Sequence, residues 1–267
     1  LATLVADGAV SYLYYADRVT QLPLGVVGVA VSTALLPTLS RQLAAGEKTA
    51  AAKSQNRGIE FALLLTLPAT AALLVIAMPI VTVLFERGAF GPAETRATAD
   101  ALMAYATGLP AYVFIRVLTP GFFAREDTTT PVRIAAVGIM VNIVLNLFLM
   151  ELWGHVGIAL ASSLAAWVNA AALAVVLKRR GQLSIDDRLI ERGPKIALAS
   201  AGMAAGLLVF ERLIAAAYAG PHVANICALA LLIFGGVLLF GGLAHVLGAA
   251  RWSDLRALRR HRIEELG

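Results

Sequence analysis

Long apolar stretches separated by short polar connections dominate this chain of 267 residues. Eight such segments can be marked: Leu1–Ala16, Val19–Leu39, Ile59–Leu84, Ala99–Phe123, Val132–Leu152, Gly154–Leu177, Pro194–Tyr218 and Val223–Ala249. Seven of them are long enough to cross a hydrocarbon core of about 30 Å, which takes about 20 helical residues. A helix satisfies its own backbone hydrogen bonds in lipid. The pattern therefore predicts an all-α integral membrane protein, a polytopic bundle of about seven full transmembrane helices and one truncated N-terminal helix.

The composition agrees with a membrane protein and argues against a soluble enzyme. Hydrophobic residues make up 59% of the chain, compared with roughly 45–50% in soluble domains. The sequence contains no Gly-rich phosphate loop ending in Lys-Ser/Thr, no His-Glu-x-x-His and no Cys/His cluster with metal-ligand spacing. Its single cysteine, Cys227, cannot form an intrachain disulfide. We expect no cofactor, no bound metal and no enzymatic activity.

Basic residues concentrate in alternate connections, which predicts the orientation in the membrane. Cytoplasmic loops carry an excess of Lys and Arg. On one predicted side lie most of the 22 basic residues, namely Arg41, Lys48, Lys53, Arg57, Arg125, Arg133, Lys178, Arg179, Arg180, Arg188, Arg192, Lys195, Arg251, Arg256, Arg259, Arg260 and Arg262. We therefore expect a cytoplasmic C-terminus. Anionic lipid head groups explain the net charge of +5, so no nucleic-acid partner is needed.

The basic stretch before the last two apolar segments suggests a division of the chain. Residues 1–180 form one helical unit, 181–193 a cytoplasmic linker and 194–249 two further transmembrane helices. Residues 250–267 are short, charged and amphipathic, which is typical of a helix lying on the cytoplasmic leaflet. Because the chain begins without Met, a basic n-region or a cleavage site, we interpret its first segment as the second half of a helix.

A charged pair, Asp17-Arg18, separates the first two apolar segments. An ionised group at bilayer depth costs several kcal/mol unless it is paired or faces water, so such groups mark ion or substrate pathways. Arg18 is therefore a candidate functional residue. The alternative is that the pair caps a helix junction at the membrane surface, with Arg18 snorkelling outward. Pro23 would then fall in the first turn of the second segment, where proline costs little.

Other polar residues within the spans have more than one interpretation. Arg116 lies roughly two turns from the cytoplasmic end of its segment, where a cavity role and snorkelling are equally consistent with the sequence. Pro110 removes one backbone hydrogen bond and should bend that segment. Asn142 and Asn146 are four residues apart on one helix face, which favours interhelical hydrogen bonding.

The loop between the fourth and fifth segments contains an acidic pair, Glu126-Asp127. Such a pair is a candidate site for a transferase acting at the membrane surface. Arg125 and Arg133 could instead neutralise it as a structural clasp. We favour the clasp, because short acidic motifs are weak indicators of catalysis.

Several runs of residues, in order, resemble the MurJ (MviN) lipid II flippase family. The runs are Leu13-Tyr14-Tyr15-Ala16-Asp17-Arg18, Leu22-Pro23-Leu24-Gly25-Val26-Val27-Gly28-Val29-Ala30, Leu36-Pro37-Thr38-Leu39-Ser40, Leu84-Phe85-Glu86-Arg87-Gly88-Ala89-Phe90, Pro120-Gly121-Phe122-Phe123-Ala124-Arg125-Glu126-Asp127-Thr128 and Thr130-Pro131-Val132. They cover residues 1 to about 147, and the remaining spans match in number and hydropathy.

The resemblance implies a bundle of fourteen helices of the multidrug/oligosaccharidyl-lipid/polysaccharide exporter superfamily. Residues 1–180 would be its second lobe, and a missing N-terminal lobe of the same protein would complete it in the bacterial inner membrane. The family places an Arg matching Arg18 in a cationic cavity that receives the diphosphate of lipid II, undecaprenyl-diphosphate-linked disaccharide peptide. The last two helices would border a groove for its polyprenyl tail. Ser11 and Asp17 match polar positions nearby, and Gln21 stands where some members have Glu.

The expected function is transfer of lipid II from the cytoplasmic to the periplasmic leaflet by alternating access, in peptidoglycan biosynthesis. Arg18, Asp17, Ser11, Gln21 and Arg116 are the candidate substrate-binding residues. A coupling cation or the membrane potential would supply the energy, at about 2.3 kcal/mol per charge per 100 mV. A cation-coupled drug or polysaccharide-lipid exporter of the same superfamily is the first alternative, and a membrane polyprenyl-phosphate transferase is the second.

Overall fold

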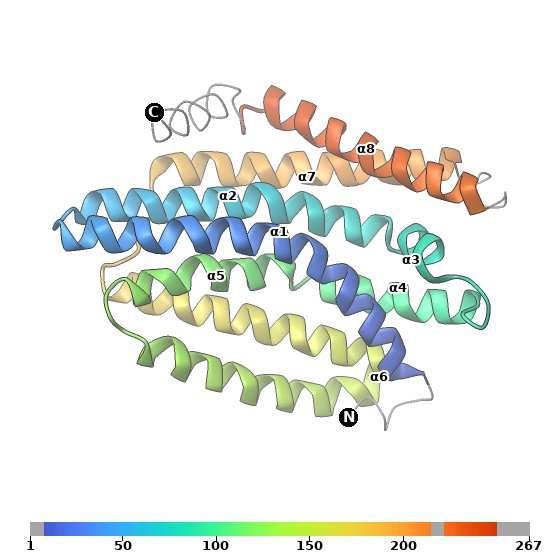
Figure 1. The fold of residues 1–267 in the computed structure, drawn as a ribbon, viewed down its shortest axis with the longest axis horizontal. Coiled ribbons are helices and arrows are strands. Elements are labelled where there is room, and N and C mark those ends of the chain that lie inside the picture. Colours follow the sequence, from blue (N-terminus) through green and yellow to red (C-terminus); the bar gives the residue numbers. More distant parts are fainter. Residues whose placement is uncertain (1–7, 215–221, 250–267) are drawn as a thin grey trace.

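The computed structural model describes residues 8–214 and 222–249 (Figure 1). In chain order, their helices are α1 (Ala9–Ala44), α2 (Lys48–Val75), α3 (Ala77–Phe85), α4 (Pro92–Ala106), α5 (Leu109–Phe123), α6 (Thr129–Arg179), α7 (Asp187–Ile214) and α8 (His222–Val246). The predicted amphipathic tail, residues 250–267, and the first residues of the leading apolar segment lie outside the described part.

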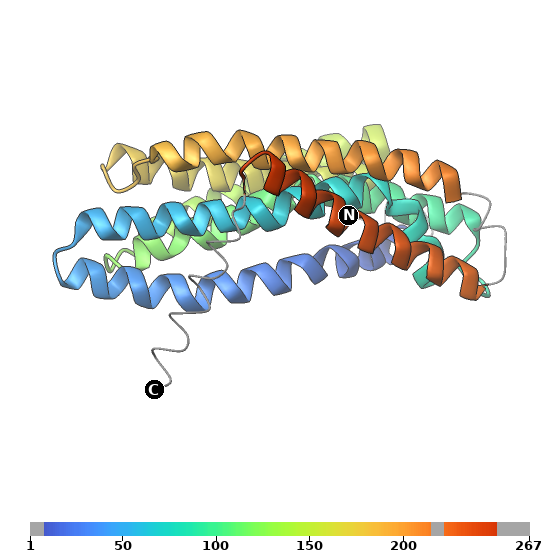
Figure 2. The same cartoon turned by 90° about the horizontal axis from the view of Figure 1, so that it is seen from above.

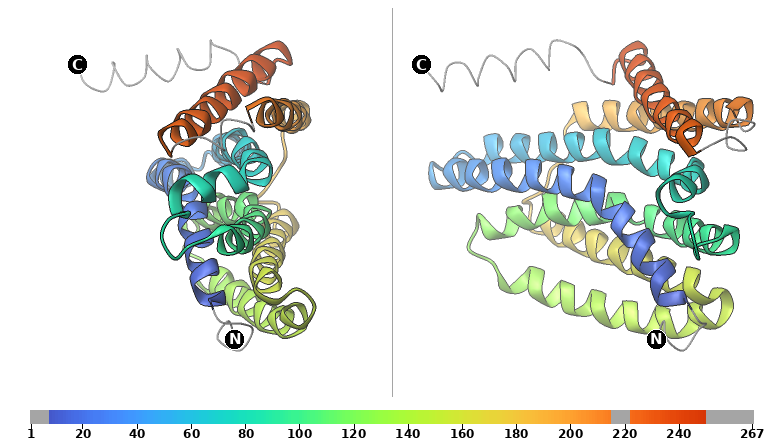
Figure 3. Two further views of the ribbon diagram at one scale, coloured as in Figure 1. Left: turned by 90° about the vertical axis from the view of Figure 1, so that its right-hand side faces the viewer. Right: turned by 45° about the vertical axis from the view of Figure 1, so that its right-hand side comes forward.

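The helices lie side by side along the long axis of the molecule, as expected for a polytopic all-α membrane protein (Figure 1). Five helical stretches among the described residues are long and apolar enough to cross a membrane. In Figures 2 and 3, the axis of α8 is oblique to that of α7, with which it is in contact. The connections α1–α2, α5–α6 and α6–α7 meet at one end of the bundle (Figure 1). This is the end at which the sequence analysis placed most of the basic residues.

The first two predicted apolar segments form one continuous helix, α1. The expected junction at Asp17-Arg18 is therefore wrong. Charged side chains leave the backbone hydrogen bonds of a helix intact, so a pair of them does not end it. Pro23 lies in the interior of α1 and not in a first turn. A proline there removes one backbone hydrogen bond, which accounts for a helix that bends (Figure 1).

Two predicted spans are each divided by a break. The third apolar segment divides into α2 and α3 at Ile76, and the fourth divides into α4 and α5 at Thr107-Gly108. A Cβ on Gly108 would lie 2.8 Å from the Cα of Ser163, so glycine permits close contact with α6. Pro110 lies in the first turn of α5. The predicted bend is thus a break just before Pro110, where its missing N–H costs little.

Helix α6 doubles back on itself at Gly154, which has φ 57° and ψ −130°. An L side chain rarely adopts this conformation, so glycine fixes the position of the reversal. The two legs contain the predicted polar pair. Asn146 donates a hydrogen bond to Asn142 at 2.9 Å, and Asn142 contacts Ser162 of the other leg at 3.4 Å. Interhelical hydrogen bonding is thereby confirmed for Asn142.

Helix α7 begins at Asp187, so the second half of the predicted linker is helical. A cluster of charges holds it against α2. The Glu60 carboxylate, 8% exposed, forms ion pairs with Arg192 at 2.7 Å and Arg188 at 3.1 Å, and also with Arg57. Arg57 pairs in turn with Asp186. We call Arg57, Glu60, Asp186, Arg188 and Arg192 the Glu60 cluster.

Candidate substrate-binding site

One face of α1 is polar and exposed, although the helix crosses an otherwise apolar bundle. Ser11, Tyr14, Arg18 and Gln21 are all exposed, at the spacing of three to four residues that places side chains on one helix face. Many exposed positions elsewhere in the spans are large and apolar, such as Phe148 and Leu238, which are 66% and 74% exposed. An exposed polar face is unfavourable against acyl chains, so this face of α1 requires water or polar partners.

Beside this face lies a cavity of about 390 Å³ between α1, α4 and α5. Its lining residues are Asp17, Thr20, Gln21, Leu24, Gly25, Tyr105, Tyr112 and Arg116. Three of the five candidate residues, Asp17, Gln21 and Arg116, are therefore brought together. Arg18 is adjacent on the exposed face of α1, and Ser11 is two helical turns away on that face.

The charges of this region are only weakly paired. The Gln21 side-chain amide donates a hydrogen bond to the Asp17 carboxylate. The Arg18 guanidinium lies over the Tyr14 ring, 4.9 Å from its centroid, in a cation–π contact. Neither Arg18 nor Arg116 forms an ion pair with a residue in the described ranges. Both guanidinium groups therefore remain able to bind an external anion with several donors each.

The Arg116 side chain reaches from α5 to the surface of α1 at Gly28. A Cβ on Gly28 would overlap with Nη1 of Arg116 and would lie 2.8 Å from its Cζ. Three residues earlier, a Cβ on Gly25 would meet no atom within 4 Å. Gly28 thus provides the space for the guanidinium, whereas Gly25 leaves open space in the cavity wall.

Sequence reasoning missed three polar residues of the cavity wall, Thr20, Tyr105 and Tyr112. The hydroxyl of Thr20 donates to the carbonyl of Ala16 at 3.0 Å, and the Tyr112 hydroxyl donates to the carbonyl of Ser162 at 3.3 Å. Tyr105 and Tyr112 stand on opposite sides of the break between α4 and α5. Their mid-span position was the available signal, because a tyrosine hydroxyl buried in a membrane bundle needs a partner.

The acidic loop, the alternative site, is a structural clasp with an unexpected partner. Asp127 pairs with Arg180 at 2.6 Å, and its carboxylate also accepts a hydrogen bond from the backbone N–H of Thr130. These contacts hold the pKa of Asp127 well below its usual range, with the Arg180 hydrogen bond as the main cause. Arg125 instead donates to the carbonyl of Gly121 at 2.5 Å. Neutralisation of Asp127 by Arg125 was thus a wrong prediction. No group of three or more potential metal ligands occurs within the described ranges.

Comparisons with known proteins decide the family. The sequence profile described as "Lipid II flippase MurJ" matches residues 1–235. The chain is 46% identical over 252 residues to the probable lipid II flippase MurJ of Rhizobium meliloti (strain 1021), covering 94% of this chain and 47% of that protein. The chain belongs to the MurJ family. The MurJ assignment made from the sequence is confirmed.

A second relative and a solved structure extend the comparison. The probable lipid II flippase MurJ of Rickettsia prowazekii (strain Madrid E) is 36% identical, over 93% of this chain and 49% of that protein. A structure titled "Lipid II flippase MurJ, inward closed conformation" superposes with a TM-score of 0.74 at 26% identity, over 93% of this chain and 48% of that one. The chain spans about half the length of the MurJ relatives that it matches.

Proposed function

We propose that this chain is the C-terminal half of a transporter that moves lipid II across the bacterial inner membrane, with no covalent chemistry. The diphosphate of lipid II binds in a hydrated space beside α1, where Arg18 and Arg116 supply cationic donors. Asp17, Gln21 and Ser11 provide polar contacts to the rest of the head group. Basic residues of an N-terminal lobe complete the site, and alternating access of the two lobes delivers the head group to the periplasmic side.

The observation that carries this proposal is the exposed polar face of α1. Arg18 on this face and Arg116 from α5 have no ion pairs to described residues, and the cavity beside them has a volume of about 390 Å³. A guanidinium presents a rigid fork of donors that matches phosphate oxygens. Family membership points to lipid II among the lipids that carry such an anion.

The orientation and the source of energy belong to the same proposal. The basic end of the bundle faces the cytoplasm, so the C-terminus is cytoplasmic and lipid II enters at that end. A membrane potential or a coupling cation drives the return of the transporter, because a moving charge gains about 2.3 kcal/mol per 100 mV. The helices α7 and α8 lie beside α2 and form the side of the bundle that contacts the polyprenyl tail.

The test is transfer of the lipid II head group in proteoliposomes that contain the full-length protein. Arg18→Ala should lower transfer at least about tenfold, because a charge-assisted hydrogen bond contributes about 1.5–3 kcal/mol. Arg18→Lys keeps the positive charge but loses the planar fork of guanidinium donors, so this variant should transfer lipid II at an intermediate rate. Arg96→Ala removes an exposed arginine of α4 outside the cavity and serves as the matched control.

Three results would contradict parts of the proposal. Equal transfer by the Arg18→Ala and Arg96→Ala variants would remove Arg18 from the site. Transfer of a cationic drug, but not of lipid II, by the unmodified protein would favour the alternative exporter. Release of a polyprenyl-phosphate product would favour the transferase.

A further inference from the structure

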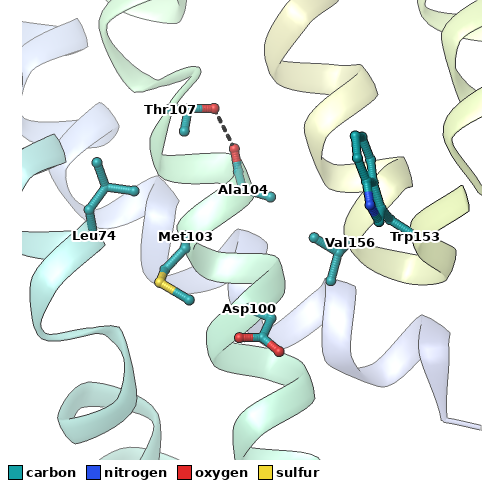
Figure 4. A pocket seen from close by; sticks show the side chains of 7 residues that line it. All are labelled: Leu74, Asp100, Met103, Ala104, Thr107, Trp153 and Val156. Carbon is teal, nitrogen blue, oxygen red and sulfur yellow. Dashed lines mark hydrogen bonds between the residues drawn. The ribbon is translucent and has the colours of Figure 1, made fainter.

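A second cavity, broad and open to the surface, lies between α2, α4 and α6, away from the site described above (Figure 4), and has a volume of about 440 Å³. Its lining residues are Leu74, Asp100, Met103, Ala104, Thr107, Trp153 and Val156, and it shares none of them with the first cavity. The walls are mostly apolar. The hydroxyl of Thr107 already donates to the carbonyl of Ala104 at 2.7 Å, which leaves Asp100 as the charged group of the lining.

Asp100 is half-buried and makes no hydrogen bond or ion pair with any residue that the structure describes. Two acids that precede it in the chain do have donors. Glu86 accepts a hydrogen bond from Thr95 at 2.8 Å, and Glu94 accepts one from the backbone N–H of Gly91 at 2.9 Å. A carboxylate among apolar walls is unfavourable unless a positive group or a donor reaches it. The cavity therefore favours an occupant that brings a positive group or a hydrogen-bond donor to Asp100.

The depth of the cavity along the bundle indicates which molecule could supply the positive group or donor. Asp100 lies eight residues after the start of α4, about 12 Å along the helix. Trp153 directly precedes the reversal of α6 at Gly154 and is 56% exposed. Tryptophan at the end of a span is typical of the membrane–water interface. The carboxylate thus lies within reach of phospholipid head groups, with apolar walls beside it for the parts of the lipid nearer the chains.

We propose that this cavity binds the primary ammonium head group of a membrane phospholipid, with Asp100 as its acceptor. A primary ammonium carries three N–H donors and a positive charge, which is what a carboxylate without a donor requires. The indole of Trp153 adds an aromatic edge to the same space, while Leu74, Met103 and Val156 contact the glycerol and upper acyl region. Phosphatidylglycerol has no cation for Asp100 and should be disfavoured. The inference is independent of the proposed transport of lipid II.

The test measures which phospholipids the full-length protein retains. Protein in nanodiscs of equal phosphatidylethanolamine and phosphatidylglycerol is partly delipidated, and the retained lipids are counted by native mass spectrometry. The unmodified protein should retain phosphatidylethanolamine over phosphatidylglycerol by about threefold to tenfold, less than a fully buried charged hydrogen bond provides. Asp100→Asn should abolish this preference. Glu151→Gln neutralises an exposed acid at the same end of the bundle, outside the cavity, and should leave the preference unchanged.

A methylation series separates hydrogen bonding from charge alone. N-methylated phosphatidylethanolamines keep the positive charge and lose N–H donors one by one, so retention should fall along the series and be lowest for phosphatidylcholine. Equal retention of phosphatidylcholine would overturn the role of the primary ammonium. An unchanged preference in Asp100→Asn, or an equal loss in Glu151→Gln, would show that the cavity does not select the lipid.

Discussion

The Glu60 cluster and the polar face of α1 are both charged regions of a membrane bundle, and the fold treats them in opposite ways. Glu60 is 8% exposed and has three arginines around it. Arg18 and Arg116 are exposed and form no ion pair within the described part of the chain. Arginine side chains thus form internal ion pairs in the first region, whereas in the second they remain available to an external anion.

The difference separates charges that stabilise the fold from charges that are available to bind a partner. Ion pairs between α2 and the start of α7 fix α7 to the rest of the bundle, because losing Glu60 removes the acid that several arginines share. On α1, Arg18 has no counter-ion among the described residues and so contributes little to the stability of the fold. Its charge is available to bind an anion. Substitutions in the first region should therefore change stability, and those in the second should change binding.

The largest expected effect is on stability, at Glu60. Glu60→Gln removes the acid that Arg57, Arg188 and Arg192 share and should lower the unfolding free energy by about 2–3 kcal/mol. This is less than the 3–5 kcal/mol of a fully buried pair, because the arginines are partly exposed. The measurement is thermal unfolding in detergent. As a control, Glu126→Gln removes an exposed acid from the α5–α6 loop at the same end of the bundle. It should change the unfolding free energy by less than about 0.5 kcal/mol.

An equal loss of stability in the Glu60 and Glu126 variants would mean that the cluster does not lock α7 to α2. Loss of lipid II binding by Glu60→Gln at a temperature where the protein stays folded would also break the comparison, because it would assign the cluster to the substrate.

A smaller effect, on binding alone, is expected at Gly28. Gly28→Ala displaces the Arg116 guanidinium from α1 and should weaken binding of a diphosphate lipid by about threefold to tenfold, as for a partly exposed charged contact. Gly138→Ala is the matched control, because Gly138 lies in α6 outside the cavity and its new methyl group would come no closer than 3.4 Å to any atom. Both changes favour the helix by up to about 1 kcal/mol, so neither should unfold the protein. Equal affinities of the two variants would show that the position of Arg116 does not matter for binding.

The smallest effect concerns the pair Asp127–Arg180, which lies near the surface. Since folding lowers the pKa of Asp127, the unfolded chain binds the proton more readily, and the pair stabilises the protein at neutral pH. This contribution begins to disappear below about pH 4 and is lost as the pH passes the folded-state pKa. The unmodified protein should unfold at a slightly higher temperature than Asp127→Asn at pH 7, and the gap should narrow at pH 3. A constant gap would contradict the assignment.

The positions of the apolar spans, and the basic residues in alternate connections, were predictable from the sequence. Hydropathy indicates which segments lie in lipid, and the count of Lys and Arg distinguishes the two ends of the bundle. Breaks and junctions were not predictable. Asp17-Arg18 changes hydropathy without disturbing the backbone, so α1 continues through it. The break at Gly108 packs against Ser163, which lies 55 residues later in the chain, and such a contact cannot be read from the local sequence.

The candidate site was predictable to the extent that charge in an apolar segment is conspicuous. Of the five candidate residues, Asp17, Gln21 and Arg116 line one cavity and Arg18 and Ser11 do not, and the role of all five in binding stays a prediction. Tyr105 and Tyr112 were missed because tyrosine is unremarkable in an apolar span until its neighbours are known. The contact of Arg116 with Gly28 was also out of reach, because it depends on the register between α1 and α5.

Helix α1 is continuous and long, so a small change of angle at its internal Pro23 would move its far end by several ångströms. Its 36 residues extend about 54 Å at 1.5 Å per residue, well beyond a hydrocarbon core of about 30 Å. The arm from Pro23 to the tip at Ala44 measures about 32 Å, so a tilt of about 10° at the proline would displace the tip by about 6 Å. A modest rearrangement around a captured anion at Arg18 would thereby be magnified at the turn into α2, where a probe on Gly46 would record it.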